Sequence, residues 1–143
     1  METRKEIALS KKAQGYNCAQ SVICTYCDLF GIDEKQAFML SEGFGGGMGG
    51  MQMTCGVVTA MFMMAGLKNS SANLSKPDSK ISTYSLVKEM AQKFKDKNQS
   101  IICAELKGSI TGKPLRSCNG CVEDACEIIE SYLRQKETTD NIF

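Results

Sequence analysis

Eight cysteines and the absence of histidine set the chemistry that this chain of 143 residues can perform. Without an imidazole, the chain can form neither a Ser–His–Asp triad nor a Cys–His catalytic pair. Zinc sites of the Cys2His2 or Cys3His type and haem attachment through Cys-x-x-Cys-His are excluded for the same reason. Thiolates are therefore the main candidates for nucleophiles and for metal ligands.

Three of the cysteines follow residues that commonly begin helices. These dipeptides are Asn17–Cys18, Thr54–Cys55 and Ser117–Cys118. At a helix start, free amides and the positive end of the helix dipole stabilise an anion, which lowers the pKa of a thiol. We expect Cys18 and Cys55 to be more acidic than free cysteine, and Cys18 and Cys118 to point inward. The alternative is that these thiols are small buried hydrophobic side chains.

Two Cys-x-x-Cys pairs, Cys24/Cys27 and Cys118/Cys121, could together offer four thiolates to zinc or to an iron–sulfur cluster. The long separation between the two pairs does not favour a compact zinc ribbon. Cys24 is expected on the polar side of its helix, which makes the first pair weakly informative. Cys126 is expected at the edge of an apolar stripe, where it would serve packing.

A glycine-rich segment, 43–50, precedes Cys55. Successive amides in such a segment can form an anion-binding nest that suits phosphate or a sulfide-bearing cluster. The candidate cofactor-binding residues are Gly45, Gly46, Gly47 and Gly49. No Gly-Lys-Ser/Thr follows, so the segment is not a P-loop. The other interpretation is tight packing of a loop against the neighbouring helices.

The hydrophobic periodicity is helical nearly throughout and predicts one all-α domain, 1–143, of about six to seven helices with a glycine-rich loop. The expected helices span about 4–14, 17–30, 33–42, 55–65, a segment opening at 77–78, 101–106 and 118–136. Asn17 and Asp33 are the expected N-caps of the second and third helices. Thr54 is expected to cap the fourth helix and Gly66 to end it. The tail after about residue 137 is expected to be flexible.

Charge and hydropathy limit the partners and the compartment. Lys plus Arg is 17 and Asp plus Glu is 16, which gives no reason to expect nucleic acid or an anionic membrane as partner. The first twelve residues lack the apolar region of a secretory signal. The longest apolar run, 57–67, is shorter than the roughly 20 residues that span a bilayer. We therefore expect a cytoplasmic protein with reduced thiols, and a secreted disulfide scaffold is the alternative.

Five stretches of the chain together resemble a known family, which is named after its C_GCAxxG_C_C cysteine pattern and described as redox-active. The stretches are 15–20, 43–49, 54–60, 103–108 and 118–125. The resemblance covers about residues 5–135. It departs from the family pattern around Cys55, where Thr54 precedes the cysteine and Val57 and Ala60 replace a usual alanine and glycine. Some relatives are haem proteins of the split-Soret type, whereas this chain has no haem attachment motif.

The resemblance implies a redox or metal-linked role for four cysteines, namely Cys18, Cys55, Cys103 and Cys118. These would bind an iron–sulfur cluster or another metal, with Cys121 as a further ligand, or would cycle between thiol and disulfide in electron transfer with an unidentified redox partner protein. The four cysteines are spread over about 100 residues and can share chemistry only if the fold brings them together. We therefore predict that at least three of the four sulfurs lie within roughly 8 Å of one another. Two separate pairs would favour disulfide cycling.

Two other functions stay open at this point. The chain could be a non-catalytic helical domain that is stabilised by zinc or that binds a partner. It could also be a thiol-dependent enzyme with one nucleophilic cysteine. The pattern of residues fixes neither a substrate nor an oligomeric state.

Overall fold

A computed structural model describes residues 1–142 of the chain and the side chains of residues 1–136. Its helices are α1 (Lys5–Ala13), α2 (Cys18–Tyr26), α3 (Glu34–Ser41), α4 (Gly45–Met48), α5 (Gly56–Asn69), α6 (Lys80–Asn98), α7 (Cys103–Lys107) and α8 (Cys118–Ile142). Two 3-10 turns, Cys27–Phe30 and Glu42–Phe44, follow α2 and α3. Within the described part, an isolated antiparallel bridge between Thr54 and Ile102 is the only strand-like pairing. The prediction of a single all-α domain is confirmed.

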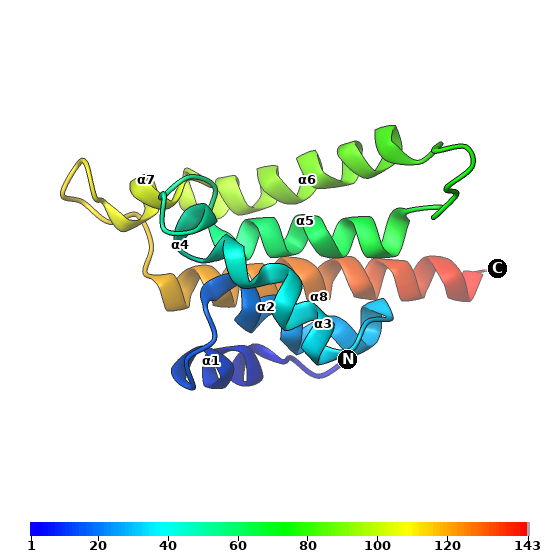
Figure 1. The fold of residues 1–143 in the computed structure, drawn as a ribbon, viewed down its shortest axis with the longest axis horizontal. Helices are drawn as coiled ribbons and strands as arrows, with labels where there is room; N and C mark the ends of the chain where they lie inside the picture. The colour runs from blue at the N-terminus through cyan, green and yellow to red at the C-terminus, as the bar shows by residue number, and fades with distance from the viewer. Residues whose placement is uncertain (143) are drawn as a thin grey trace.

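Helix α5 forms the centre of the molecule. It lies beside α6 and α8, which run along its length (Figure 1), and it also packs against α2. Apolar side chains cover nearly the whole circumference of α5, and such a helix is stable only when other helices surround it. The buried residues of α5 include Val57, Val58, Ala60, Met61, Met64 and Ala65.

The ends of several helices differ from the expected ones. Helix α5 does not end at Gly66 but continues to Asn69, because packing against α6 outweighs the low helix propensity of one glycine. The N-cap of α5 is Cys55 itself, and α6 begins at Lys80. Helix α8 continues past Lys136 to Ile142. The side chains after about residue 137 lie outside the described ones, so the flexibility expected for this tail stays a prediction.

The predicted N-caps of α2 and α3 are confirmed. The side chain of Asn17 accepts a hydrogen bond from the amide of Gln20 at 2.8 Å, and the side chain of Gln20 accepts one in return from the amide of Asn17 at 3.0 Å. Asp33 caps α3 through the amide of Gln36 at 2.7 Å. These contacts satisfy amides that have no partner within the helix.

A buried carboxylate ties the start of the chain to α2 and α8. Glu130 of α8 is 2% exposed and accepts hydrogen bonds from the hydroxyl of Tyr26 and from the amide of Arg4, the latter at 2.8 Å. The guanidinium of Arg4 in turn contacts the carbonyl of Thr25 and the carboxylate of Asp28. Helices from both ends of the chain are therefore locked together on one side of the core.

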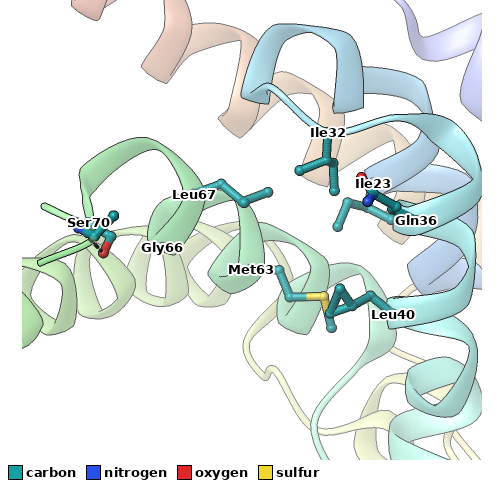
Figure 2. A pocket seen from close by; sticks show the side chains of 9 residues that line it. Ile23, Ile32, Gln36, Leu40, Met63, Gly66, Leu67 and Ser70 are labelled. Atoms are coloured by element: carbon teal, nitrogen blue, oxygen red, sulfur yellow. Dashed lines mark hydrogen bonds between the residues drawn. The ribbon is translucent and has the colours of Figure 1, made fainter. Parts of the chain in front are cut away.

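The structure has an apolar groove between α5 and the α2–α3 region, with a volume of about 720 Å³. Leu67 and Met63 of α5 face Ile32 and Leu40 across it (Figure 2). Of the described residues that line this groove, none is a cysteine and none is charged. The groove is thus separate from the chemistry of the thiols. No described helix combines the length and the apolar character that crossing a bilayer requires.

Candidate functional site

The starts of four helices meet at one end of the molecule. Cys18 is the first residue of α2, Cys55 is the N-cap of α5, Cys103 is the first residue of α7 and Cys118 is the first residue of α8. All four cysteines and Cys121 line one cavity of about 230 Å³, which we call the thiol cavity. Helices α4 and α7 and the beginning of α8 lie at this end, at the left of Figure 1.

An antiparallel contact between distant segments brings Cys55 and Cys103 to the cavity. The amide of Cys55 donates to the carbonyl of Ile101 at 2.8 Å, and the amide of Cys103 donates to the carbonyl of Met53 at 2.6 Å. The bridge between Thr54 and Ile102 lies between these bonds. Cys55 and Cys103 are therefore diagonal neighbours on one face of the bridge. Each then begins a helix that leads away from the cavity.

The glycines of segment 43–50 let the backbone approach the thiols. Gly46 and Gly47 adopt positive φ values of 61° and 70° inside the short α4. A Cβ on Gly47 would lie 2.6 Å from the Cβ of Cys103, and one on Gly45 would lie 2.6 Å from the side chain of Asn17. Such distances exclude any larger residue unless the backbone shifts.

One of these glycines also contacts a thiol directly. The amide of Gly46 donates a hydrogen bond to the sulfur of Cys18, which partly offsets the effect of burial on that thiol. Gly49, with φ of 63°, ends α4 in the left-handed conformation. Close packing thus accounts for Gly45 and Gly47, and the cofactor-binding role predicted for Gly45, Gly46, Gly47 and Gly49 stays a prediction.

The pKa of the Cys55 thiol is lowered to about 7, from an ordinary value of 9.0. The largest cause is a hydrogen bond from the thiol of Cys121, and the amides of Val57 and Val58 and the charge of Lys107 act in the same direction. Burial opposes them. The pKa of Cys121 is raised because its proton is held between the two sulfurs. Cys55 therefore ionises before Cys121, with which it shares that proton.

The expected acidity of Cys18 is wrong. Burial raises the pKa of the Cys18 thiol, and the nearby sulfurs of Cys55 and Cys118 add to the increase. Burial likewise raises the pKa of Cys103. A position at a helix start therefore lowers the pKa of a thiol only where hydrogen bonds to the sulfur outweigh desolvation.

The inward orientation expected for Cys118 is also wrong. Cys118 is exposed, whereas Cys121 is 3% exposed. Ser117 caps α8 through the amide of Gly120 at 3.0 Å, so Cys118 lies in the outermost turn. Cys121 follows one turn deeper on a similar face of the helix and so takes the inward position. The Cys-x-x-Cys spacing already identified Cys121 as a further candidate, but not as the hydrogen-bond partner of Cys55.

The remaining cysteines lie outside the residues that line the thiol cavity. Cys24 is not on a polar face as expected but is 5% exposed, and its sulfur contacts the carbonyl of Glu34 at 3.8 Å. Burial raises its pKa to about 11. Cys126 is fully buried against Tyr26, which confirms its packing role. The Cys24/Cys27 and Cys118/Cys121 pairs therefore do not contribute to one site.

Sequence reasoning missed the cations of the thiol cavity. Lys12, Lys107 and Arg116 line it, and they come from the end of α1, the end of α7 and the residues before α8. No sequence motif indicates these three cations, although Arg116 lies two residues before Cys118. The lining set contains no Asp or Glu within the described residues. Positive side chains therefore surround the thiols, although burial still raises the pKa of Cys18 and of Cys103.

The thiol cavity is the place where several side chains able to bind a metal line one space. Within the side chains of residues 1–136, no three Cys, Asp or Glu groups are placed closely enough to hold a metal ion. The cysteines would have to draw together around an ion or cluster. The metal-ligand role predicted for Cys18, Cys55, Cys103 and Cys118, with Cys121, stays a prediction, as does the spacing of roughly 8 Å between their sulfurs.

Comparison with known proteins decides the family. The family model described as "Putative redox-active protein (C_GCAxxG_C_C)" matches residues 16–132. The chain belongs to this family. The match includes all eight cysteines and the whole lining of the thiol cavity except Lys12. No curated protein and no solved structure matches the chain.

Proposed function

We propose that the thiol cavity is a thiol–disulfide redox centre in which Cys55 is the nucleophile. The observation that carries this proposal is the hydrogen bond from Cys121 to Cys55, which helps to lower the pKa of Cys55 to about 7. An attacking thiol exchanges fastest when its pKa lies near the ambient pH, because it is then both ionised and nucleophilic. Cys121 is already in contact with the same sulfur and can serve as the second thiol.

The proposed exchange takes place in two steps. The Cys55 thiolate attacks one sulfur of an external disulfide, forms a mixed disulfide and releases the other half as a thiolate. Cys121 gives its proton to the released thiolate, and its sulfur then attacks Cys55 and expels the second half, which takes a proton from water. The external disulfide gains two electrons, and Cys55 and Cys121 lose two as they form a disulfide.

The exposed Cys118 supplies a route back to the reduced state. It lies at the exposed side of the cavity and shares α8 with Cys121, so its thiolate can attack the sulfur of Cys121, which forms a Cys118–Cys121 disulfide and releases the Cys55 thiolate. A dithiol of a redox partner protein then attacks Cys118, becomes a disulfide itself and returns two electrons to the site. A reducing compartment such as the cytoplasm would provide such a donor.

Alkylation against pH tests the nucleophile. Iodoacetamide labelling of each cysteine, measured by peptide mass spectrometry, is expected to show a midpoint near pH 7 for Cys55. In Cys121→Ala the midpoint should rise, because the thiolate loses its main hydrogen-bond donor. Cys126→Ala is the matched control, since Cys126 lies under Tyr26 and away from the cavity. A Cys55 midpoint at pH 9 in the unmodified protein would contradict the proposal.

Redox titration tests the pairing. The protein is equilibrated with graded ratios of 2-mercaptoethanol and bis(2-hydroxyethyl) disulfide, a monothiol couple that cannot cyclise, and disulfides are located by mass spectrometry after acid quenching. A bond between Cys55 and Cys121 is expected to appear in a single two-electron step. In Cys121→Ala, the mixed disulfide on Cys55 should persist instead of resolving. Equal resolution in the variant would show that another cysteine is the second thiol.

A metal–thiolate centre is the second candidate, favoured by the five cysteines that line one cavity. Thiolates bind iron–sulfur clusters and zinc, and the five sulfurs exceed the four that either centre requires. Anaerobic purification followed by metal and sulfide analysis distinguishes the candidates. Iron with sulfide and visible absorbance would indicate a cluster, redox-silent zinc would indicate a structural domain, and metal-free protein with reactive Cys55 would support disulfide exchange.

A further inference from the structure

Two lysines give the thiol cavity an excess of positive charge. Lys12 and Lys107 line the cavity, and neither forms an ion pair with any group among residues 1–136. Arg116 differs from them, because it donates to Asp124 at 3.0 Å and 3.3 Å and lies 3.8 Å from Glu123. The charge of Arg116 is thus largely balanced, while that of the two lysines is available to a ligand.

The negative charge of an ionised Cys55 does not explain why two lysines line the cavity. The charge of Lys107 acts to lower the pKa of Cys55 and of Cys103, whereas Lys12 is not among the main causes of either pKa shift. A single thiolate also balances at most one of the two positive charges. The remaining charge faces a hollow without a carboxylate in its described lining, which is an arrangement that attracts anions.

The size of the cavity and the burial of Cys55 limit what can reach the nucleophile. Cys55 is 7% exposed and lines a hollow of about 230 Å³. A disulfide on the surface of a folded protein is surrounded by its own backbone and cannot enter a space of that size. A small disulfide, of which one half occupies the cavity, can bring its sulfur to Cys55.

We propose that the substrate of the thiol cavity is a small anionic disulfide, one that carries carboxylate groups close to its sulfur–sulfur bond. This inference rests on the proposed exchange function and names its substrate class. Lys12 and Lys107 bind the carboxylates, and Cys55 attacks the nearer sulfur in the two-electron exchange given above. Opposite charges accelerate encounter, and the effect falls as salt screens them.

A charge series of small disulfides tests the substrate class. The probes are 3,3′-dithiodipropionate with two negative charges, neutral bis(2-hydroxyethyl) disulfide, and cystamine with two positive charges. Each rate of Cys55 oxidation is divided by the rate of the same disulfide with 2-mercaptoethanol, which removes intrinsic reactivity. The anionic probe is expected to react on the order of tenfold faster than the neutral one at low salt. The advantage should largely vanish at 1 M salt, where the screening length is about 3 Å.

Lysine variants assign the effect to the cavity. Lys107→Gln and Lys12→Gln should each lower the anionic-to-neutral ratio several-fold, and the ratio is insensitive to any change in the thiolate fraction. Lys95→Gln on α6 is the matched control, because Lys95 does not line the cavity. An equal ratio in all variants overturns the substrate class, while continued reaction with the neutral disulfide upholds the exchange function. Failure of all three probes, with slow iodoacetamide labelling of Cys55, overturns both.

Discussion

The thiols of Cys55 and Cys18, both at helix starts, differ in acidity because their sulfurs accept different hydrogen bonds. Cys55 receives hydrogen bonds from a second thiol and from two amides, and these outweigh its burial. Cys18 receives bonds from the amides of Gly46 and Ala19, but burial is the larger effect and its pKa rises. The helix dipole alone therefore does not select the nucleophile. The extra donor from Cys121 does, and it comes from another helix.

Gly56 is the residue that lets α5 begin against α2. A Cβ at this position would lie 2.5 Å from the sulfur of Cys18 and 2.9 Å from the carbonyl oxygen of Phe44. We predict that Gly56→Ala lowers the free energy of unfolding by roughly 1–3 kcal/mol, since overpacking forces the backbone to shift. Urea denaturation measures the change. Labelling of Cys18 should also speed up as α2 and α5 move apart.

Gly66→Ala is the matched control for this prediction. Gly66 lies inside the same helix, and nothing is within 4 Å of the position that its Cβ would take. Alanine there should raise the free energy of unfolding by about 0.5–1 kcal/mol through its higher helix propensity. Similar destabilisation by both substitutions would mean that close approach at Gly56 is not the cause.

At the scale of elements, the N-caps could be predicted because they depend on residues only three positions apart. Asn17 with Gln20 and Asp33 with Gln36 form the contacts that the sequence indicated. The position of Cys103 beside the thiol cavity could not be predicted in this way, since it depends on the bridge between Thr54 and Ile102. Nor did local pattern reveal that α5 passes Gly66, because the neighbouring α6 stabilises that turn.

Asn17 is the cap that couples α2 to the site. Its side chain also donates to the carbonyl of Glu42 at 2.9 Å, which ties α2 to the turn before α4. We predict that Asn17→Ala lowers the free energy of unfolding by about 1–2 kcal/mol. Because Cys18 begins the same helix, its alkylation rate should increase as that turn frays. Both quantities are measured on one preparation by urea denaturation and mass spectrometry.

Asp33→Ala serves as the comparison for the loss of a cap. Asp33 caps α3 and does not line the thiol cavity. Its removal should cost a similar free energy of about 1 kcal/mol but leave the labelling of Cys18 unchanged. Equal acceleration of Cys18 in both variants would indicate general loosening of the fold rather than a local effect of the Asn17 cap.

Across the whole molecule, the thiol cavity and the N-terminal segment are attached to different parts of α8. The thiol cavity lies where α2, α5, α7 and α8 begin, whereas Glu130 joins α8 to Tyr26 and to Arg4. Tyr26→Phe removes a buried donor from a buried carboxylate and should lower the free energy of unfolding by roughly 1–3 kcal/mol. The pH midpoint of Cys55 labelling should not move. Tyr84→Phe, at a side chain that is 55% exposed, should stay within about 0.5 kcal/mol.

The sequence was sufficient for the helical class and for the importance of the thiols, but the assembly of the site depends on contacts between distant segments. The absence of histidine and the helix-start cysteines pointed to thiolate chemistry. Which thiol ionises first depends on Cys121 meeting Cys55, and which thiol is exposed depends on where α8 begins. Lys107 and Lys12 join the cavity from two further helices. Those arrangements follow from packing, which periodicity alone does not specify.

Ionisation of Cys55 should be visible in the stability of the whole protein. Its pKa is about 7 in the folded state and near 9.0 in the unfolded chain, so between these pH values the unfolded state binds more protons. The free energy of unfolding then rises with pH over this window, by about 1.4 kcal/mol for each pKa unit of difference. The contribution is present above pH 9 and is lost as the pH falls through 7. Above pH 9 the raised pKa values of Cys18, Cys103 and Cys121 act in the opposite direction.

The difference between two variants isolates this contribution from that of other groups. Urea unfolding of the reduced protein at pH 7 and pH 9 should show that Cys55→Ser loses the rise, since serine does not ionise in this range. Cys24→Ser should keep it, because the pKa of Cys24 is raised to about 11 and its thiol stays protonated in the folded state at both pH values. The unmodified protein should thus gain stability relative to Cys55→Ser, but not relative to Cys24→Ser, as the pH increases. Parallel curves for the unmodified protein and Cys55→Ser would show that the Cys55 thiolate is not stabilised by the fold.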